Sequence, residues 1–289
     1  MLSGRALQPV EPLAHPRELR VMVPCLPIRP APPRADNYSP VWFIGRTEKL
    51  STYPTRSLPR GGIHNQGTLT IDNSTFSAHG NADPDKGGAA ILNEGTLTVK
   101  NSEFLGNQAG YSGGAIYNVG TLTVRHSTFS GNAALFEFGG HIYNIGGTAT
   151  VAHSTFSGGF AGIGGGAIWG GLVSVHNSEF SGNLASFFGG AVGGASLTVK
   201  NSTFSNNHAC CSFGDGGAIW GGGTIQNSTF SGNVADHFGG AIFNFGSSIE
   251  NSTITQNTAG VAGGGIYNVG TLSLTRTSVT ENTPDDIFP

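Results

Sequence analysis

GGAIYNVGTLTVRHSTFSGN, which spans Gly113 to Asn132, recurs in close variants from about Gly61 to the end of the 289-residue chain. The aromatic residue of its S-T-F segment marks each copy and returns every 24 to 28 residues. Periods of this length are typical of solenoids, in which each copy stacks on the next. The sequence therefore predicts about nine coils. The marker positions are Phe76, Phe104, Phe129, Phe156, Phe180, Phe204, Phe230, Ile254 and Val279.

Each copy holds three short β-type runs, for example Ala115 to Tyr117, Thr121 to Val124 and Ser127 to Ser130. Glycine and asparagine separate the runs, and these residues tolerate the positive φ of tight turns. No run is long enough for a helix, and no apolar period of 3.6 residues is present. We expect an all-β fold, a single-stranded parallel β-helix, right-handed because parallel crossovers prefer that hand. At about 4.8 Å per coil, the rod would be roughly 40 Å long.

Alternation along each run predicts which side chains are buried, because successive strand residues point to opposite faces. Leu122 and Phe129 point inward on this basis. Ile116 also points inward, which would turn Ala115 and Tyr117 outward. The phenylalanines would then stack in the interior and supply much of the buried area. Recurring asparagines that end the first run or precede the S-T-F run would form hydrogen-bonded columns.

Residues 1–60 differ in composition from residues 61–289. They hold 11 of the 14 prolines, only 2 of the 47 glycines, and more basic than acidic residues. Proline-rich sequence cannot join a sheet ladder, so we expect a disordered Pro/Arg-rich leader followed by one β-helix domain. The abrupt change at Gly61 also fits a reading frame that starts in the wrong place. We find neither a secretory signal, because Pro24 and Pro27 break the longest apolar stretch, nor an apolar run long enough to span a membrane.

The repeats resemble a known family at two motifs. Gly-Gly-Ala-Ile, as at Gly113 to Ile116, is similar to the GGA[ILV] motif of chlamydial polymorphic outer membrane proteins, and Phe-x-x-Asn, as at Phe129 and Asn132, is similar to its partner motif. More broadly, the copies resemble pectin-lyase-like β-helices of bacterial surface proteins. The resemblance covers nearly all of residues 61–289. It implies an adhesin-like passenger displayed at the cell surface or secreted, here as a piece of a larger surface protein. No membrane barrel of that family is found in the sequence.

The candidate binding site is an outward stripe at the position after the inward isoleucine. It would place aromatic rings one above another on a rigid surface, suited to sugar rings or to a host or cell-surface protein. Alternatively, the loops at Leu135 to Phe138 and Ser186 to Phe188 fold over the stripe and bury it. The stripe consists of Tyr117, Tyr143, Trp169, Trp220, Phe243 and Tyr267, with His64, Leu92 and Gly193 at the remaining positions.

Catalysis is the second hypothesis, because polysaccharide lyases and hydrolases share this type of fold. They need paired carboxylates, or a basic residue beside acidic calcium ligands. Glu103 and Glu179 occupy one repeat position but lie three coils apart, roughly 14 Å by strand spacing. The domain is also acidic, which repels polyanionic substrates. We therefore expect no catalytic residues, while Asp83 and Asp85 in one enlarged loop leave weak calcium binding as an alternative to a solvated turn.

Metal binding, ice binding and nucleic-acid binding each depend on a single feature of the sequence. Cys25, Cys210 and Cys211 form no disulfide framework, and His208 beside the last two is a weak metal signal, so no metal or cofactor is expected. Outward Thr-x-Thr pairs on four consecutive coils, from Thr68 to Thr150, leave ice binding as a third hypothesis against the ordinary preference of threonine for strands. No nucleic-acid partner is expected from an acidic domain.

Overall fold

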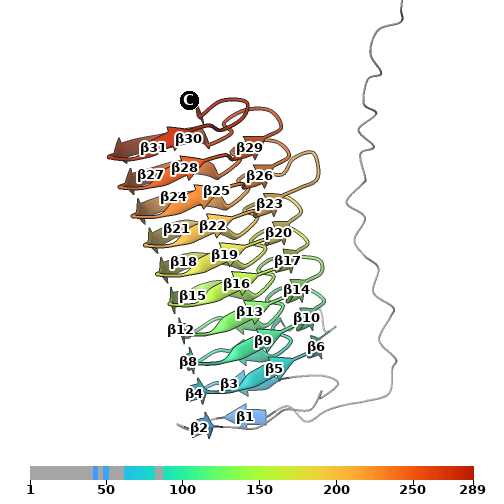
Figure 1. The fold of residues 1–289 in the computed structure, drawn as a ribbon. Helices are drawn as coiled ribbons and strands as arrows, with labels where there is room; N and C mark the ends of the chain where they lie inside the picture. The colour runs from blue at the N-terminus through green and yellow to red at the C-terminus, as the bar shows by residue number, and fades with distance from the viewer. Residues whose placement is uncertain (1–41, 45–47, 52–61, 82–86) are drawn as a thin grey trace, which may run out of the picture.

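The computed structural model describes residues 42–44, 48–51, 62–81 and 87–289. Within them every regular element is a β-strand, and all pairings are parallel between successive coils. Figure 1 shows about nine coils stacked as a rod, so the predicted parallel β-solenoid is confirmed. Like segments of neighbouring copies lie directly over one another, for example Phe104, Phe129 and Phe156.

Three sheets run the length of the rod. The 15-stranded sheet consists of β1 Trp42–Ile44, β2 Glu48–Ser51, β3 Ile63–Asn65, β4 Thr68–Asp72, β7 Ile91–Asn93, β8 Thr96–Lys100, β11 Ile116–Asn118, β12 Thr121–Arg125, β15 Ile142–Ala152, β18 Ile168–His176, β21 Val192–Lys200, β24 Ile219–Gln226, β27 Ile242–Glu250, β30 Ile266–Thr275 and β32 Ile287–Phe288. The nine-stranded sheet consists of β5 Thr75–Ser77, β9 Glu103–Leu105, β13 Thr128–Ser130, β16 Thr155–Ser157, β19 Glu179–Ser181, β22 Thr203–Ser205, β25 Thr229–Ser231, β28 Thr253–Thr255 and β31 Ser278–Thr280. The eight-stranded sheet consists of β6 Gly80–Asn81, β10 Gln108–Ala109, β14 Ala133–Ala134, β17 Phe160–Ala161, β20 Leu184–Ala185, β23 His208–Ala209, β26 Val234–Ala235 and β29 Thr258–Ala259.

The core follows the predicted alternation inside the strands. Leu122, Val124 and Phe129 are fully buried, and seven phenylalanines from Phe76 to Phe230 form one column. Adjacent rings in this column are 4.6 to 4.9 Å apart and nearly parallel, with interplanar angles of 2° to 8°. This stacking of nearly parallel rings adds to the free energy gained from burying them.

The prediction that Ala115 points outward is wrong. The side chain is fully buried, as are the equivalent alanines of the other coils. Ala115 lies in the bend before β11, where strand alternation does not apply. Its carbonyl accepts hydrogen bonds from the backbone N–H groups of both Ala90 and Ile91, which turns the residue into the core.

A column of buried asparagine and histidine side chains, the interior ladder, runs along the rod beside the phenylalanines. It consists of His79, Asn107, Asn132, His141, Asn183, Asn207, Asn233, Asn257 and Asn282. The asparagines up to Asn233 are the last residues of Phe-x-x-Asn motifs, whereas Asn257 and Asn282 follow Ile254 and Val279 at the same spacing. The Nδ2 of a ladder asparagine donates toward the next coil, as in Asn107 and Asn183. The last donor reaches the carboxylate of Asp286, so the column ends on a charged acceptor.

Two coils lack the ladder asparagine: His79 takes its place in the coil of Phe76, and Gly159 in the coil of Phe156. The coil with Gly159 also departs at the Gly-Gly-Ala position, where His141 replaces alanine. The buried imidazole fills the gap: Nδ1 lies 2.9 Å from Asn132 Nδ2, and Nε2 lies 3.2 Å from Asn183 Oδ1. A Cβ on Gly159 would come within 2.2 Å of the Gly166 carbonyl oxygen and within 2.6 Å of His141 Nε2, so the glycine leaves room for the imidazole as well as for the backbone of the next coil. Burial lowers the pKa of His141 to about 3, and the ring is therefore neutral.

Additional strands pair with the first and last coils of the described rod. β1 and β2, from the segment predicted to be disordered, pair in parallel with β3 and β4. The other residues of 1–60 and the acidic loop with Asp83 and Asp85 lie outside the described residues, so those predictions stay untested. At the other end β32 pairs with β30, and the Asp285 carboxylate accepts hydrogen bonds from Gly263 and Gly264.

Candidate functional site: an outward aromatic stripe and its groove

The predicted stripe is one continuous register column on the 15-stranded sheet. Tyr117 pairs with Tyr143, Tyr143 with Trp169, and Trp220 with Phe243 and Phe243 with Tyr267, while Gly193 stands between the two tryptophans. The C-terminal strand extends the column, because Phe288 pairs with Tyr267 at a ring distance of 5.3 Å. All six predicted aromatic residues are half-buried.

Loop phenylalanines account for this partial burial. Phe138 packs against Trp169 at 4.6 Å, Phe188 against Trp220 at 5.1 Å, and Phe238 against Tyr267 at 4.2 Å. Each precedes a Gly-Gly pair, and isolated bridges align these loops from coil to coil. The loops therefore cover one edge of the stripe and brace its rings, and the other edge stays accessible.

The stripe carries no charge of its own. Burial, and then the neighbouring Glu137 carboxylate, raise the pKa of the Tyr117 phenol; burial, then Tyr117 and Glu137, raise that of Tyr143. Both phenols are protonated at neutral pH and can donate hydrogen bonds. The surface thus offers aromatic faces and neutral polar groups.

A second asparagine column, the turn ladder, borders the stripe. It contains Asn65, Asn93, Asn118 and Asn144 on successive coils, and Asn244 and Asn268 further along. Glycine replaces asparagine on the three coils between these groups, at Gly170, Gly194 and Gly221. The backbone closes in there: a Cβ on Gly194 would lie 1.9 Å from the Gly170 carbonyl oxygen, and one on Gly221 would lie 2.2 Å from that of Gly194.

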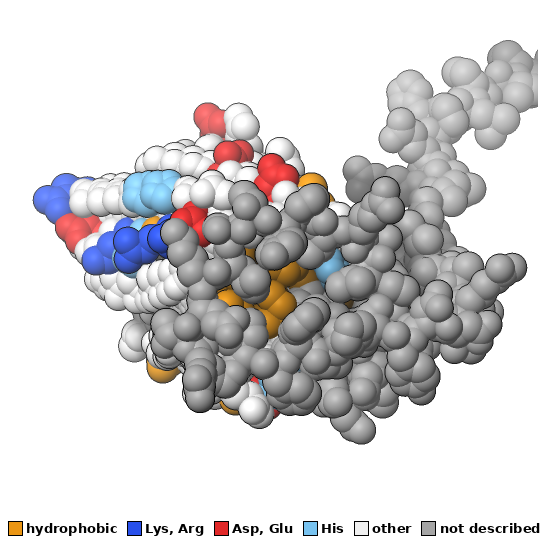
Figure 2. Space-filling view, turned by 90° about the horizontal axis from the view of Figure 1, so that it is seen from below, with side chains coloured by type: hydrophobic (Ala, Val, Ile, Leu, Met, Phe, Trp, Pro, Cys, Tyr) orange, Lys and Arg blue, Asp and Glu red, His pale blue; other side chains and the backbone are white. Residues whose placement is uncertain are grey.

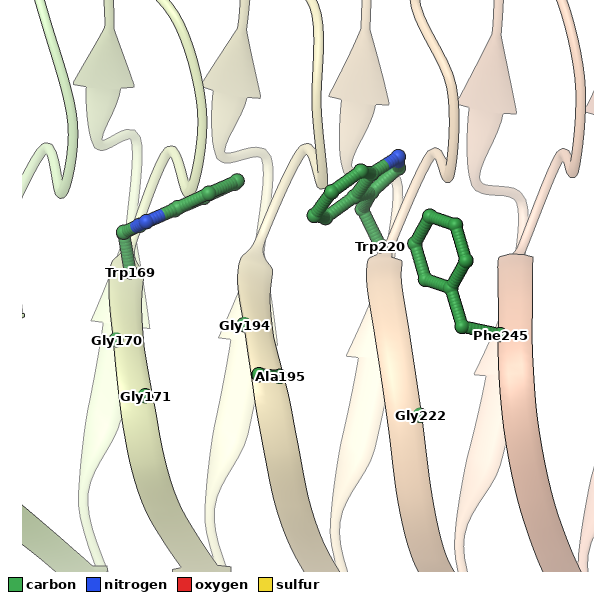
Figure 3. Close-up of a pocket in the computed structure, with 8 residues that line it drawn as sticks. All are labelled: Trp169, Gly170, Gly171, Gly194, Ala195, Trp220, Gly222 and Phe245. Carbon is green, nitrogen blue, oxygen red and sulfur yellow. The ribbon is translucent and has the colours of Figure 1, made fainter.

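The three glycine coils form the floor of a hollow of about 440 Å³, the aromatic groove. Figure 3 shows Trp169 and Trp220 projecting from separate coils above this floor, with Phe245 beside Trp220. Trp169 extends across Gly193, where any side chain would collide with it, and stacks on Trp220 at 5.5 Å. The lining residues are Trp169, Gly170, Gly171, Gly194, Ala195, Trp220, Gly222 and Phe245.

Within the floor, Gly171 and Ala195 are exposed, whereas Gly170 and Gly194 are buried. The strand register shifts between Gly194 and Leu197 and again between Gly221 and Gly223. Such irregularities release N–H and C=O groups from the ladder. The groove therefore combines aromatic walls with neutral hydrogen-bonding groups, and none of its lining side chains is charged.

Sequence reasoning missed Phe245, which is 46% exposed and packs edge-on against Trp220 at 4.6 Å. A signal was present, because each turn-ladder asparagine from Asn118 onward is followed by a large apolar residue. Val119, Ile145, Phe245 and Val269 form this second exposed row.

The residues weighed for other chemistries are arranged as follows. Glu103 and Glu179 are separated by two intervening strands, as predicted. His208 Nε2 lies 2.8 Å from the Asp236 carboxylate, and Cys211 N–H donates to the same carboxylate. Within the described part of the chain, no group of three or more His, Cys, Asp and Glu side chains is placed to hold a metal ion. The Thr-x-Thr pairs lie in register from Thr68 to Thr148.

Comparison with known families supports the resemblance drawn from the motifs. Residues 101–119 and 227–244 match the family described as Chlamydia polymorphic membrane protein (Chlamydia_PMP) repeat. No curated protein and no solved structure matches the chain. The predicted resemblance to these repeats is confirmed, and the family suggests a passenger-like module of a surface or outer-membrane protein. Among the residues the structure describes, no helix is long and apolar enough to cross a membrane.

Proposed function

We propose that this chain is a non-catalytic, adhesin-like binding module of the cell surface, and that the aromatic groove holds an uncharged sugar ring of a glycan. The observation that carries the proposal is the pair of tryptophans, Trp169 and Trp220, above a glycine floor. Indole faces pack against the apolar face of a sugar, while backbone groups of the floor can bond its hydroxyls.

The shape of the groove supports a small ring as ligand. Its volume of about 440 Å³ lies in the range of small-molecule sites, about 300 to 1,000 Å³. Its walls come from strands of a continuous sheet, so the rings are held in place before a ligand arrives. Such preorganisation lowers the entropy cost of binding.

A non-catalytic role is supported by the placement of the carboxylates. Glycosidases place two carboxyl groups about 5 to 9.5 Å apart across the scissile bond. Glu103 and Glu179 are three coils apart, which is roughly 14 Å. None of the residues that line the aromatic groove can transfer a proton as a carboxylate or imidazole would.

The test is binding of the full chain to an array of immobilised neutral oligosaccharides. Ala195→Arg places a bulky side chain in the groove from an exposed position and leaves the aromatic packing intact. We expect it to weaken binding at least about tenfold. Ser196→Arg, exposed on the same strand but outside the groove, is the control with the same added charge.

Two results would contradict the proposal. One is an unmodified chain that binds no neutral glycan on the array. The other is equal loss of binding in Ala195→Arg and Ser196→Arg, which would make charge, and not occupation of the groove, responsible. Binding of a cell-surface protein that Ala195→Arg blocks, with no glycan bound, would reassign the ligand from sugar to protein.

A further inference from the structure

Basic side chains gather at one corner of the rod, although the domain as a whole is acidic. Figure 2 shows Lys, Arg and His side chains along one edge, with Asp and Glu side chains among them. The basic ridge lies where strands such as β8 and β12 end and the chain turns into the nine-stranded sheet. It consists of Lys100, Arg125, His126, His153, His176 and Lys200.

Register places these residues on neighbouring coils. Lys100 pairs with Arg125, and His176 pairs with Lys200, in one column with Ala152 between the two pairs. His126 and His153 stand one residue later, and their rings stack at 5.0 Å and 12°. Five coils at about 4.8 Å each give a ridge roughly 20 Å long.

The carboxylates that face the ridge offset its lysines and arginine at neutral pH. Asp72 lies 3.5 Å from Lys100 Nζ, and Glu103 and Glu179 stand on the adjoining strands β9 and β19. Three carboxylates thus stand beside three permanent cations, and Glu250, two coils beyond Lys200 in the same column, pairs with Arg276. Glu179 and His153 line the same shallow polar hollow.

The three histidines make the local charge depend on pH. Burial, and then Lys200, lower the pKa of His176, so this ring takes its proton later in an acid titration than an ordinary histidine. Histidine is the side chain whose charge changes between pH 5 and 8, so each proton that an imidazole gains makes the nearly neutral ridge more positive. The rest of the domain would stay acidic until its own carboxylates titrate.

Hydroxyl groups lie beside the ridge on the same outward face. Thr98, Thr123 and Thr198 each stand two residues before a ridge position. Residues two apart on a strand share a face, so charged groups and hydroxyls form one surface. The ridge carries no Trp, Tyr or Phe, on which the bases of single-stranded nucleic acid stack.

We propose that the basic ridge is a second binding surface, switched on by mild acid, for an anionic polysaccharide. Sulfate or carboxylate groups would contact the lysines, the arginine and the protonated histidines, and the sugar hydroxyls would contact the threonines. This surface lies apart from the aromatic groove, and the inference does not depend on the proposed neutral-glycan site.

The test measures the affinity of the full chain for heparin, a sulfated polysaccharide, at about pH 5.5 and pH 7.5 and equal ionic strength. We expect binding about threefold tighter, or more, at the lower pH, because the ridge gains positive charge from its imidazoles. The histidine variant combines His126→Asn, His153→Asn and His176→Gln. Other coils carry Asn or Gln at these positions, as at Asn101 and Gln226, so the repeat tolerates them. We expect its affinity to be nearly independent of pH.

The matched control combines His64→Gln and His208→Gln, two histidines on other faces that pair with Glu94 and Asp236. It should keep the full pH dependence. The proposal is overturned if the unmodified chain binds heparin no better at pH 5.5, or if the histidine variant keeps the pH dependence. Equal affinity for a single-stranded DNA oligomer would overturn the assignment to polysaccharide. A negative heparin result would not change the interpretation of the neutral-oligosaccharide array, because the two tests probe different surfaces.

Discussion

The interior ladder and the turn ladder handle a missing asparagine in opposite ways. In the interior ladder, the gap at Gly159 is filled by the His141 side chain, which restores contacts to Asn132 and Asn183. In the turn ladder, no side chain replaces the missing asparagines at Gly170, Gly194 and Gly221. The backbones of neighbouring coils pack too closely there to admit a Cβ atom. Beside the phenylalanine column, a buried polar group without a partner is costly, so a defect must be repaired. At the turn, the defect opens a groove between tryptophans.

Asn207→Leu should have the largest effect, because it removes four hydrogen bonds of the interior ladder. Asn207 Oδ1 accepts from the backbone N and Nδ2 of Asn183, and its Nδ2 donates to Phe180 O and Asn233 Oδ1. Orphaned buried groups cost about 1 to 3 kcal/mol each. We expect a loss of about 4 kcal/mol in the free energy of unfolding, measured by urea titration. A loss below about 1 kcal/mol would show that the ladder is not needed.

His141→Ala should cost about 3 kcal/mol, slightly less than loss of a ladder asparagine. It leaves a cavity and removes a partner of Asn132 Nδ2 and Asn183 Oδ1, but both atoms keep one other hydrogen bond. Urea titration of this variant beside Asn207→Leu gives the ranking. If alanine, the usual residue of the repeat here, raised stability, the view that His141 repairs the ladder would be wrong.

Acid should weaken the repaired ladder in a predictable pH window. The pKa of His141 is about 3 in the folded chain and about 6.5 when unfolded. The unfolded state therefore binds more protons below pH 6.5, and stability falls as pH drops toward 3, by up to about 1.4 kcal/mol per unit. Unfolding free energies at pH 7, 6, 5 and 4 check this. His79, whose pKa burial also lowers, contributes in the same direction, so the slope must be compared with that of a chain lacking His141.

Asn118→Gly, in the turn ladder, should have the smallest effect, about 1 kcal/mol. Asn93 Nδ2 keeps Gly95 O and Thr121 O as acceptors after the change, so few groups lose every partner. A thermal unfolding curve close to that of the unmodified chain is expected. A loss as large as that of Asn207→Leu would remove the distinction between the two ladders.

Much of the fold follows from the repeat itself, because like residues return at one spacing. That spacing predicted the stacked coils, the phenylalanine column and the register of the aromatic stripe. It could not predict β14, because a strand of two residues is too short to show an alternating pattern. It also could not predict that Ala115 points inward, because that depends on the hydrogen bonds that the Ala115 carbonyl accepts from Ala90 and Ile91. The His141 repair was also missed, because its two substitutions lie in separate runs that only folding brings together.

The aromatic stripe could be predicted from the sequence, whereas the rest of the groove and the basic ridge could not. The stripe residues were named from their position in the repeat, whereas Phe245 and the bracing of Trp169 by Phe138 depend on side-chain placement. The basic ridge escaped notice because net charge was weighed over the whole domain. Its residues are scattered in sequence, and only the coil register places His176 beside Lys200.

The most direct test of the repair is a double-mutant cycle between His141→Ala and Gly159→Asn, with unfolding free energies from urea titration. Together the two changes restore the repeat pattern, so Gly159→Asn should cost much less stability in the His141→Ala chain than in the unmodified chain. In the unmodified chain its Cβ would collide with His141 as well as with the Gly166 carbonyl oxygen, whereas in the His141→Ala chain only the backbone contact must relax. We predict a coupling energy of about 2 kcal/mol or more. Effects that add within about 0.5 kcal/mol would contradict the claim that His141 stands in for the missing asparagine.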